Sequence, residues 1–467
     1  MNKHIHFIGI GGIGMSGIAL ILLRKGTKVS GSDLRENKVT ADLARAGADI
    51  FTGHSPENVN GADTVVYSSA IKDDNPEMIE AKRRGIPVIK RGQALAELMK
   101  DKQVITVTGS HGKTTTTSLV SLLLSEAGLR PTAAIGGILK NTDTNAYFGD
   151  GEFFVAEADE SDGSFLYYNP RYSIITNIDR EHLDYYKNFE NELAAFGQFI
   201  AKTKKNGCVF CCGDDPNLKS ILAGYKGRKV LFGLNSNADI HPGNINMEGL
   251  SSWFDCIYNH KPIGRFSLSL AGLHNISNAL SVIALGIELG IDTAVIKKAL
   301  AGYRGSGRRM EVKFRDNGYT VIDDYAHHPT EIKATLEAVR NMNPGRIIAI
   351  FQPHRYTRTQ LLLEEFGHSF TQADYVIITD IYAASEPAIE GVSGRRIYEK
   401  IKEYTPQKEA AFLHKEQLIA HLLKVLKAGD LVITLGAGDI VKVCDELVGE
   451  LKGQGQIRGA AQKAYDV

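Results

Sequence analysis

A Gly-Lys-Thr triplet stands where a predicted strand gives way to a predicted helix. The segment GSHGKTT at residues 109–115 follows the apolar strand Val104–Val107 and opens a long helical pattern near Lys113. Backbone N–H groups and a lysine at such a junction can hold the β- and γ-phosphates of ATP, and a hydroxyl can reach Mg²⁺. The spacing is a short G-x-x-G-K-T, because Val107 occupies the place of the first glycine in generic phosphate loops. The residues predicted to bind ATP here are Gly109, Ser110, His111, Gly112, Lys113, Thr114 and Thr115.

A second glycine-rich turn lies near the N-terminus. Residues 9–14, GIGGIG, contain G-x-G-x-x-G between the strand His4–Ile8 and a helix, and Asp33 stands at the end of the next strand. This pattern places a diphosphate at a helix N-terminus and an acid near a ribose. NAD, FAD and a nucleotide sugar such as a UDP-sugar would all satisfy it. The residues predicted to bind this ligand, including a small polar run after a further strand, are Gly11, Gly12, Ile13, Gly14, Asp33, Ser68, Ser69 and Ala70.

Acidic and imidazole side chains follow two strands downstream of Lys113. Glu157 ends the apolar run that begins at Phe153, while His182 and Asp184 follow the strand Ser173–Thr176. Parallel strands present their carboxyl ends at one sheet edge, so these groups should gather near the phosphates. Carboxylates and a hydroxyl are suitable Mg²⁺ ligands. The sequence therefore predicts a metal and phosphate cluster beside the Lys113 loop.

Two polar segments stand out in the last third of the chain. Residues 323–328, DDYAHH, offer metal-binding residue types, but a further partner at the helical spacing of zinc sites is missing from the sequence. Residues 352–358, QPHRYTR, follow the strand Ile347–Phe351 and carry Arg355 and Arg358. Two arginines in such a loop could form a solvated face. In a neutral protein, beside two histidines, a site for a carboxylate or phosphate is the better interpretation.

Alternating strands and helices must position these residues. Short β-branched runs alternate with helical patterns along the whole chain, which is typical of α/β domains with parallel sheets. The expected organisation is a Rossmann-like domain over residues 1–101, a central domain like a P-loop ATPase over 102–305, and a Rossmann-like C-terminal domain over 306–467. The glycine-bearing segment Gly302–Gly307 is predicted to be a hinge. The polar residues from Leu451 onward are predicted to form a loosely held tail.

Composition excludes several functional classes. Lys plus Arg number 54 and Asp plus Glu number 54, so the chain has no global positive field to hold a nucleic acid or an anionic membrane. The absence of an apolar run of 18 residues and of a signal-like N-terminus predicts a soluble cytoplasmic protein, with no obligate protein partner evident. The five cysteines are an odd number, which fits a reducing compartment. The run Cys208–Cys212 could be half a zinc site, but a buried strand is the favoured interpretation.

The chain resembles the Mur ligases of peptidoglycan precursor synthesis. One loop for a nucleotide ligand, a second loop for ATP and a third domain with paired arginines are typical of an ATP-driven ligase. The resemblance covers all three domains, and the short phosphate loop is this family's own form. The matching motifs are HFIGIGGIGMSGIA at 6–19, GSHGKTTTT at 109–117, AEADESDGSF at 156–165, NIDREHLDYY at 177–186, HNISNAL at 274–280, DDYAHHPTEI at 323–332 and FQPHRYTRT at 351–359.

This resemblance implies an activity, substrates and cofactors. The expected reaction is the ATP-dependent joining of L-alanine to the lactyl carboxylate of UDP-N-acetylmuramate through an acyl phosphate, with Mg²⁺ as the second cofactor. By the same resemblance, domain one binds the UDP-sugar, domain two binds ATP, and domain three brings the amino acid. The carboxylate first attacks the γ-phosphorus of ATP, and the amine of L-alanine then attacks the acyl carbon.

The resemblance also implies a role for individual residues. Lys113, His182, Arg309 and His327 form the expected catalytic set. Lys113 would bridge the β- and γ-phosphates, and Arg309 would reach the γ-phosphate. Thr114 and Glu157 would hold one Mg²⁺, and His182 would help to hold a second. Asn275 and Asn278 would face the adenine, and Asp324 would lie on the ATP side of the interface between domains. The residues expected to position L-alanine and the muramoyl carboxylate are His327, Arg355 and Arg358.

The sequence departs from the family pattern at two positions. Ser110 stands where the family usually has Thr, which keeps the hydroxyl. The carbamylated lysine of several sister ligases would fall near Gly197, so no carbamate is expected. The alternative inside the family is the recycling ligase that joins a whole tripeptide to the same UDP-sugar. An NAD-dependent dehydrogenase would leave the Lys113 loop unexplained, and a non-catalytic nucleotide sensor would not need Arg355 or Arg358.

Overall fold

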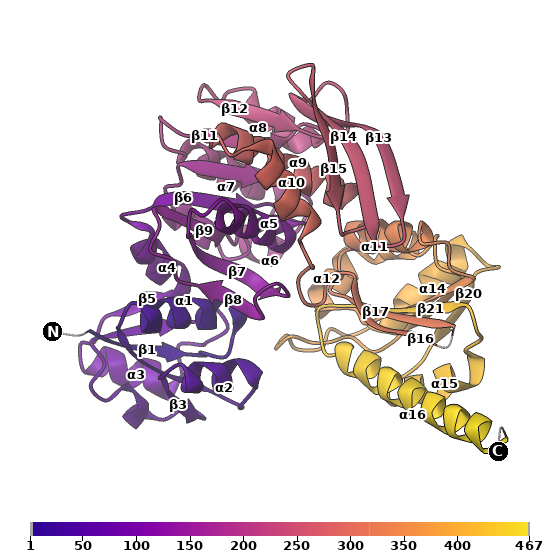
Figure 1. The fold of residues 1–467 in the computed structure, drawn as a ribbon. Coiled ribbons are helices and arrows are strands. Elements are labelled where there is room, and N and C mark those ends of the chain that lie inside the picture. The colour runs from indigo at the N-terminus through magenta and orange to yellow at the C-terminus, as the bar shows by residue number, and fades with distance from the viewer. Residues whose placement is uncertain (1–2, 317, 466–467) are drawn as a thin grey trace. The chain divides into compact units, whose positions relative to one another are not determined.

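The computed structural model describes residues 3–316 and 318–465, with side chains as far as Gly453. The chain divides into two compact units (Figure 1). The first unit comprises Met1–Ile245, Trp253–Ser269 and Asn275–Ser306, and the second comprises Asn246–Ser252, Leu270–His274 and Gly307–Val467. The first unit contains two sheets and the second contains one, and each sheet consists mostly of parallel strands with helices packed against it. The expected α/β class is therefore confirmed.

The first sheet has five parallel strands in the order β3-β2-β1-β4-β5. This order reverses beside β1, so the turn after β1 lies at the crevice where open α/β sheets bind ligands. Helix α1 also contacts β7 and β8 of the second sheet. The elements are β1 (His4–Ile8), α1 (Ile13–Arg24), β2 (Lys28–Asp33), α2 (Lys38–Arg45), β3 (Asp49–Thr52), η1 (Pro56–Val59), β4 (Thr64–Tyr67), α3 (Pro76–Arg83), β5 (Val88–Lys90) and α4 (Arg91–Met99).

The second sheet has ten strands in the order β15-β14-β13-β12-β11-β10-β6-β9-β7-β8. Strands β12, β11, β10, β6, β9 and β7 run parallel, and β8 pairs antiparallel with β7. Its strands are β6 (Gln103–Thr108), β7 (Thr132–Leu139), β8 (Thr144–Tyr147), β9 (Phe153–Glu157), β10 (Tyr172–Ile175), β11 (Cys208–Cys212), β12 (Lys229–Phe232), β13 (Ile240–Glu248), β14 (Ser251–Tyr258) and β15 (Lys261–Leu268). Its helices are α5 (Lys113–Glu126), η2 (Ser164–Tyr167), α6 (Leu183–Tyr186), α7 (Phe189–Ala201), α8 (Pro216–Leu222), α9 (Leu273–Glu288) and α10 (Thr293–Ala301).

The third sheet lies in the second unit and has six strands in the order β16-β17-β21-β18-β19-β20. Only the pair β16 and β17 is antiparallel among its described pairs. Its strands are β16 (Glu311–Asp316), β17 (Tyr319–Asp324), β18 (Arg346–Phe351), β19 (Tyr375–Ile378), β20 (Glu409–Phe412) and β21 (Asp430–Leu435). Its helices are α11 (Pro329–Arg340), α12 (Tyr356–Leu361), α13 (Leu363–Gly367), α14 (Gly394–Tyr404), η3 (Lys415–Gln417), α15 (Leu418–Val425) and α16 (Val441–Tyr465).

The core of the third sheet shows why its strands are continuously apolar. Successive side chains of a strand point to opposite faces. Ile347 and Phe351 of β18 therefore join one buried cluster, while Ile348 and Ile350 join the cluster on the other face. Because helices cover both faces, both sets of side chains are excluded from water.

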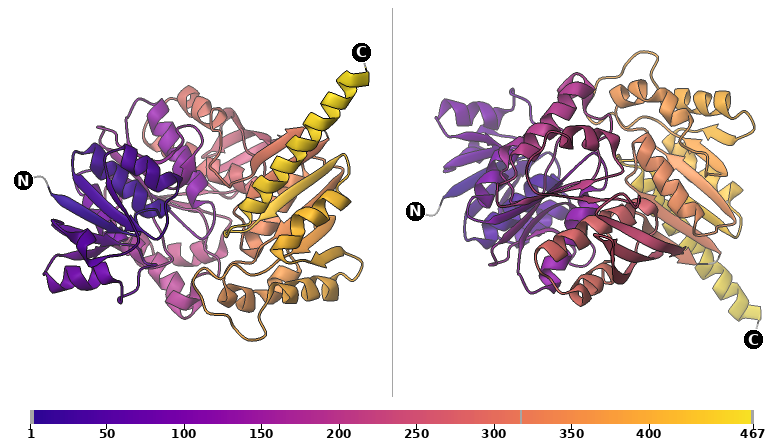
Figure 2. Two further views of the ribbon diagram at one scale, coloured as in Figure 1. Left: turned by 90° about the horizontal axis from the view of Figure 1, so that it is seen from below. Right: turned by 90° about the horizontal axis from the view of Figure 1, so that it is seen from above.

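Two local predictions have clear outcomes. The run Cys208–Cys212 is the fully buried strand β11, and the five cysteines are free, so the buried-strand interpretation is confirmed. From Leu451, where the sequence predicts a loosely held tail, the chain is helical, because α16 continues to Tyr465 and extends beyond the third sheet (Figure 2). The side chain of Leu451, which belongs to this helix, packs in one of the two buried clusters of the third sheet.

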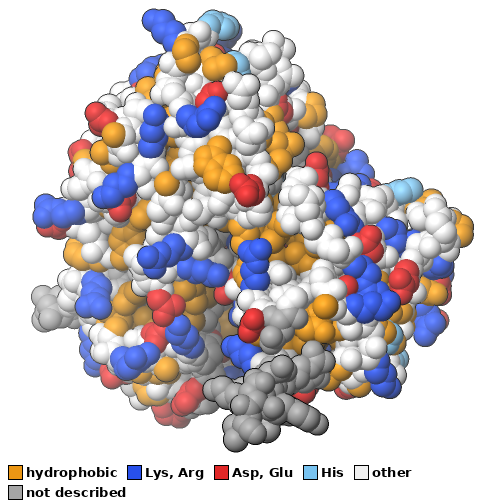
Figure 3. Space-filling view, turned by 45° about the vertical axis from the view of Figure 1, so that its right-hand side comes forward, with side chains coloured by type: hydrophobic (Ala, Val, Ile, Leu, Met, Phe, Trp, Pro, Cys, Tyr) orange, Lys and Arg blue, Asp and Glu red, His pale blue; other side chains and the backbone are white. Residues whose placement is uncertain are grey.

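The surface is of mixed charge. On the face drawn in Figure 3, Lys and Arg side chains are interspersed with Asp and Glu. In the part of the chain that the structure describes, no helix is long and apolar enough to cross a bilayer.

Candidate active site

The first glycine-rich turn joins β1 to α1 and is held by an acid from β2. Gly12 is the N-cap of α1, and the carboxylate Oδ2 of Asp33 accepts the N–H of Gly11 at 2.9 Å. A Cβ on Gly11 would lie 2.8 Å from the same oxygen, so this position needs glycine. Ser68, Ser69 and Ala70 follow β4 at the same edge of the sheet. The structure thus brings together all the residues predicted for the UDP-sugar, and Asp33 also orients the loop.

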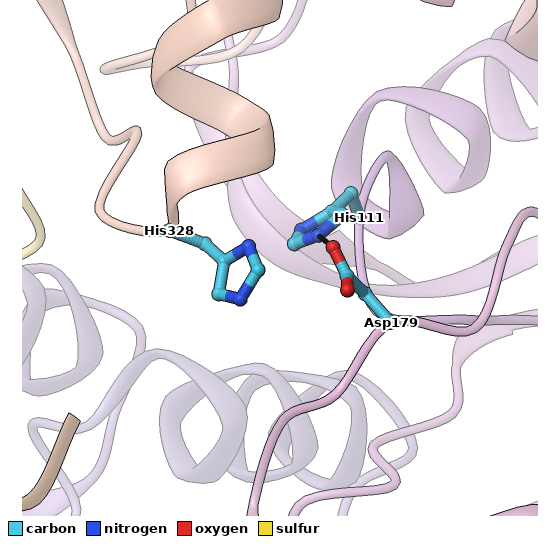
Figure 4. Close-up of side chains that lie close together, drawn as sticks. All are labelled: His111, Asp179 and His328. Carbon is cyan, nitrogen blue, oxygen red and sulfur yellow. Dashed lines mark hydrogen bonds and ion pairs between the residues drawn. The ribbon is translucent and has the colours of Figure 1, made fainter. Parts of the chain in front are cut away.

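The phosphate loop joins β6 to α5 and is fixed by the segment after β10. Ser110 N donates to the carbonyl of Asn177 at 3.0 Å, and His111 N donates to Asn177 Oδ1 at 2.8 Å. The His111 ring Nε2 lies 3.0 Å from Asp179 Oδ2 (Figure 4). Gly112 has φ +82° and caps α5, and its missing Cβ would lie 2.7 Å from Asn278 Oδ1. The first N–H groups of α5 have no carbonyl partner within the helix, which makes this turn an anion site.

Lys113 folds back over its own loop. Its Nζ donates to the carbonyls of Gly109 at 2.6 Å and Ser110 at 3.0 Å, and to Glu160 Oε1 at 2.7 Å. Burial lowers the pKa of Lys113, but Glu160 and Asp159 outweigh burial and hold the pKa above its usual value. Lys113 is therefore a cation at the place where the phosphates are expected.

Glu157 is the last residue of β9, and its carboxylate lies beside Thr114, the residue that follows Lys113. Thr114 Oγ1 donates to Glu157 Oε1 at 3.2 Å, and Gly136 N donates to Glu157 Oε2 at 2.9 Å. A Cβ on Gly136 would lie 2.3 Å from the carboxylate, so glycine allows β7 to approach. The predicted pair of Thr114 and Glu157 is thus assembled, and its hydroxyl and carboxylate oxygens suit Mg²⁺.

His182 lies in a second group of possible metal ligands. Its Nε2 is 3.4 Å from Glu160 Oε1 and 3.6 Å from Glu181 Oε2. The ligand atoms of these three residues all lie within 4.8 Å of one another, and Glu160 Oε2 is buried without a hydrogen-bond partner among the described residues. Burial lowers the pKa of His182, but Glu160 and Glu181 raise it overall. Such an orphaned oxygen beside an imidazole fits a cation better than a closed structural core.

A further buried acid lies near this group. Glu192 on α7 is fully buried, and neither of its carboxylate oxygens has a hydrogen-bond partner among the described residues. Burial raises the pKa of Glu192 to about 8. Sequence patterns missed Glu160, Glu181 and Glu192. The first two lie inside the quoted motifs AEADESDGSF and NIDREHLDYY, which was the available signal, whereas nothing marks Glu192 as different from other helical acids.

A cleft of about 180 Å³ runs from the first glycine-rich loop to the second sheet, where Glu157 accepts a hydrogen bond from Thr114 of the phosphate loop. Ile13 and Gly14 line it on the side of the first loop, and Gly136, Glu157 and Asp159 line it on the side of the second sheet. Arg91, at the start of α4, also lines it. A substrate bound at the first loop can thus extend toward the phosphate loop within the first unit.

Asn275 and Asn278 are buried near the N-terminus of α9, with exposed fractions of 4% and 6%. The approach of Asn278 to Gly112 places this helix against the phosphate loop. Their predicted contact with adenine stays a prediction.

In the second unit, Arg309 and Asp324 lie close to Tyr325 and Glu331. The Arg309 guanidinium is 5.0 Å from the centre of the Tyr325 ring, and its Nη1 is 3.7 Å from Glu331 Oε1. Asp324 accepts the N–H groups of Met310 at 2.6 Å and Ala326 at 2.8 Å. Burial raises the pKa of Asp324 to about 6. Asp324 thus fixes the backbone directly after Arg309 and directly after Tyr325.

His327 lies beside the predicted arginine loop. Its ring centre is 5.6 Å from that of His354, and Arg358 Nη1 is 3.2 Å from His354 Nδ1. Arg355 has φ +72°, and its Nη1 is 3.6 Å from Glu386 Oε1. Burial, reinforced by His327 and the arginines, lowers the pKa of His354 to about 3. The structure therefore gathers His327, Arg355 and Arg358 at one edge of the third sheet and adds His354, which the sequence did not single out.

Comparisons with known proteins agree over nearly the whole chain. Residues 4–103 match the family described as "Mur ligase family, catalytic domain", residues 107–286 the "Mur ligase middle domain", and residues 308–438 the "Mur ligase, glutamate ligase domain". The UDP-N-acetylmuramate–L-alanine ligase of Desulfatibacillum aliphaticivorans is 48% identical over 440 residues, which cover 94% of this chain and 96% of that protein. The ligase of the same name from Geotalea daltonii is 47% identical over 451 residues, covering 96% and 98%.

Two solved structures are similar over nearly the same length. The UDP-N-acetylmuramate–alanine ligase of Thermotoga maritima has a TM-score of 0.83 and 33% identity, covering 97% of this chain and 99% of that chain. A murein peptide ligase of Psychrobacter arcticus has a TM-score of 0.71 and 25% identity, covering 96% and 98%.

Proposed function

The chain belongs to the Mur ligase family, and we propose that it joins L-alanine to the lactyl carboxylate of UDP-N-acetylmuramate at the expense of ATP. This reaction belongs to peptidoglycan precursor synthesis. The observation that carries the proposal is the cleft in the first unit, which begins at Ile13 and Gly14 and ends at Glu157, the acid bonded to Thr114 of the phosphate loop. A nucleotide sugar bound at one end can present a carboxylate to a nucleotide bound at the other.

The first chemical step is an attack of the lactyl carboxylate on the γ-phosphorus of ATP, because a carboxylate is a poor electrophile until it is activated. Two anions repel each other, so cations must offset the repulsion. The N–H groups at the start of α5 and the ammonium of Lys113 supply positive charge on one side. Arg309 of the second unit is the proposed further cation at the γ-phosphate.

The donors in the first unit fit Mg²⁺. Thr114 and Glu157 would hold one ion, and His182, with Glu160 and Glu181 beside it, would hold a second. Bound there, Mg²⁺ would neutralise part of the phosphate charge.

The second step needs a neutral amine and a proton acceptor. His327 Nδ1 lies 3.0 Å from the carbonyl of Tyr325 and 3.2 Å from Glu331 Oε2, and both are acceptors. Nδ1 must therefore carry the hydrogen, which leaves Nε2 of a neutral ring to accept a proton from the amino group. Arg355 and Arg358 would hold the carboxylate of L-alanine, since a planar guanidinium matches a carboxylate.

The recycling ligase that takes a whole tripeptide is the second candidate inside the family. The murein peptide ligase structure is less similar to this chain than the alanine ligase structure, in both TM-score and identity. A single amino acid is therefore the favoured substrate.

A product assay tests the proposal. The protein would be given ATP, Mg²⁺ and UDP-N-acetylmuramate with each amino acid in turn, or with the tripeptide, and the nucleotide products identified by mass spectrometry. We expect a UDP-sugar heavier by one alanyl residue, with one ADP released per product. UDP-N-acetylglucosamine, which lacks the lactyl carboxylate, should release no ADP. A tripeptide product without an alanyl product would contradict the proposal.

A further inference from the structure

Arg91 is the only Lys or Arg side chain among the described residues that line the cleft. The other charged groups there are the carboxylates of Glu157 and Asp159. A UDP-sugar adds two phosphate charges to this acidic cleft. Unless a cation of the cleft offsets them, the repulsion would oppose binding.

The position of Arg91 is set by two contacts. Its Nη2 donates to Asp159 Oδ2 at 2.8 Å, and Asp162 Oδ2 lies 3.9 Å away. A Cβ on Gly14 would lie 2.6 Å from Arg91 Nη1, so the guanidinium rests against the first turn of α1. Burial raises the pKa of Asp159, but Arg91 and Lys113 outweigh burial and hold the pKa below its usual range. Asp159 is therefore an anion that holds the guanidinium in place.

The first turn of α1 is also where a diphosphate is expected, since helix N-termini bind phosphate through free N–H groups. We propose that Arg91 binds the diphosphate of the UDP-sugar, and that Asp159 positions its guanidinium. Gly14 is then required for more than a tight turn, because any side chain there would displace the arginine. This inference rests on the proposed function, which supplies the UDP-sugar as ligand.

Calorimetric titrations with three ligands test the proposal without any turnover. Uridine carries no phosphate, UDP carries the diphosphate, and UDP-N-acetylmuramate adds the lactyl carboxylate. We expect Arg91→Ala to weaken UDP and UDP-N-acetylmuramate by the same factor, about 10- to 100-fold for a lost charge-assisted pair. Uridine affinity should not change. Arg91→Lys should be intermediate, because it keeps the charge without the planar fork.

The other patterns would each overturn the proposal. A loss confined to UDP-N-acetylmuramate would assign Arg91 to the lactyl carboxylate, and an equal loss for uridine would show a merely structural role. The double variant Arg91→Ala/Asp159→Asn removes the carboxylate left unpaired by the single change. If it restores UDP affinity, the effect came from Asp159 and the proposal fails.

Arg83→Ala is the matched control, because Arg83 is an exposed arginine of α3 that pairs with Glu80 outside the lining of the cleft, and its affinities should equal those of the unchanged protein. If the unchanged protein binds none of the three ligands, the proposed function itself fails, and this result is distinct from every outcome for Arg91.

Discussion

Lys113 and Glu160 form a buried ion pair, and replacing Lys113 should affect both turnover and stability. The ammonium contacts Glu160 at 2.7 Å, and Glu160 is fully buried. Lys113→Ala should lower turnover by at least about 10³-fold, the scale of removing a key transition-state charge. UDP-sugar affinity should stay nearly intact, because the proposed sugar site is at the other end of the cleft, beside Ile13 and Gly14. Turnover and calorimetric binding measure the two effects.

Melting temperatures separate a loss of catalysis in Lys113→Ala from a loss of folding stability. Leaving a buried charge unpaired costs about 3–5 kcal/mol, so Lys113→Ala should also melt earlier. Lys113→Ala/Glu160→Gln should recover the melting temperature but not the turnover. Lys100→Ala, an exposed lysine paired with Glu97, should change neither. If Lys113→Ala keeps more than a tenth of the activity, the phosphate site is assigned to the wrong loop.

Glu192 should make the stability of the folded protein depend on pH. Its pKa is 4.5 in an ordinary environment, and burial raises it to about 8 in the folded protein. The folded state therefore keeps a proton that the unfolded chain releases, so stability falls as pH rises through this window, by about 1.4 kcal/mol per pH unit. Glu192→Gln removes this cost. Chemical denaturation should show the variant to be more stable than the unchanged protein at pH 9 and equal to it at pH 4.5.

The control for this prediction is on the same helix. Glu190→Gln changes an exposed acid of α7, and its stability should follow that of the unchanged protein at every pH. Parallel stability curves for Glu192→Gln and the unchanged protein would show that Glu192 is ionised in the folded state.

At the scale of elements, the turn before α5 depends on two properties of Gly112. Its φ is +82°, and its missing Cβ would lie 2.7 Å from Asn278 Oδ1. Gly112→Ala should cost about 1–2 kcal/mol for the left-handed conformation, and the clash with Asn278 should also distort the phosphate loop. Gly128, after the same helix, has φ +72° and open space around it. Gly128→Ala should show the first cost without loss of ATP affinity, whereas equal ATP affinities for the two variants would contradict the role of the clash.

The loop between β18 and α12 makes a separate prediction about substrate affinity. Arg355→Ala and Arg358→Ala should each raise the KM for L-alanine or for the UDP-sugar by roughly 10- to 100-fold, the effect of losing a charge-assisted fork. The KM for ATP should move little. Arg396→Ala, an exposed arginine of α14 paired with Glu399, is the control. If only the KM for ATP rises, this loop binds ATP and not L-alanine or the UDP-sugar.

Elements differ in how well the sequence predicts them. The strands that carry site residues at their ends are short runs rich in apolar and β-branched residues beside turn signals, so β1, β6, β9, β10 and β18 were predictable from pattern alone. The strands β13 and β15 were not, because proline and glycine interrupt them, and pairing along the sheet edge outweighs local propensity. His182 and Arg355 have positive φ without being glycine, which no residue pattern indicates.

At the scale of the whole molecule, the motifs predicted which loops carry the chemistry, but not how charge is balanced among them. Arg91 and Asp159 are separated by 68 residues and meet only in the folded chain. Lys113 and Glu160 are likewise 47 residues apart. Such pairs depend on which strands become neighbours, and the order of the second sheet brings β9 beside β6. The spacing of residues along the sequence does not predict this strand order, so it did not predict the two ion pairs.

Labelling the oxygen atoms of the lactyl carboxylate tests directly whether an acyl phosphate forms. UDP-N-acetylmuramate would be labelled with ¹⁸O in its lactyl carboxylate and incubated with the protein, ATP, Mg²⁺ and L-alanine. If the carboxylate attacks the γ-phosphorus, one labelled oxygen must leave with the phosphate when the amine attacks the acyl carbon. We predict that mass spectrometry of the released inorganic phosphate shows one ¹⁸O per alanyl product. Unlabelled phosphate accompanying a full yield of product would contradict activation through an acyl phosphate.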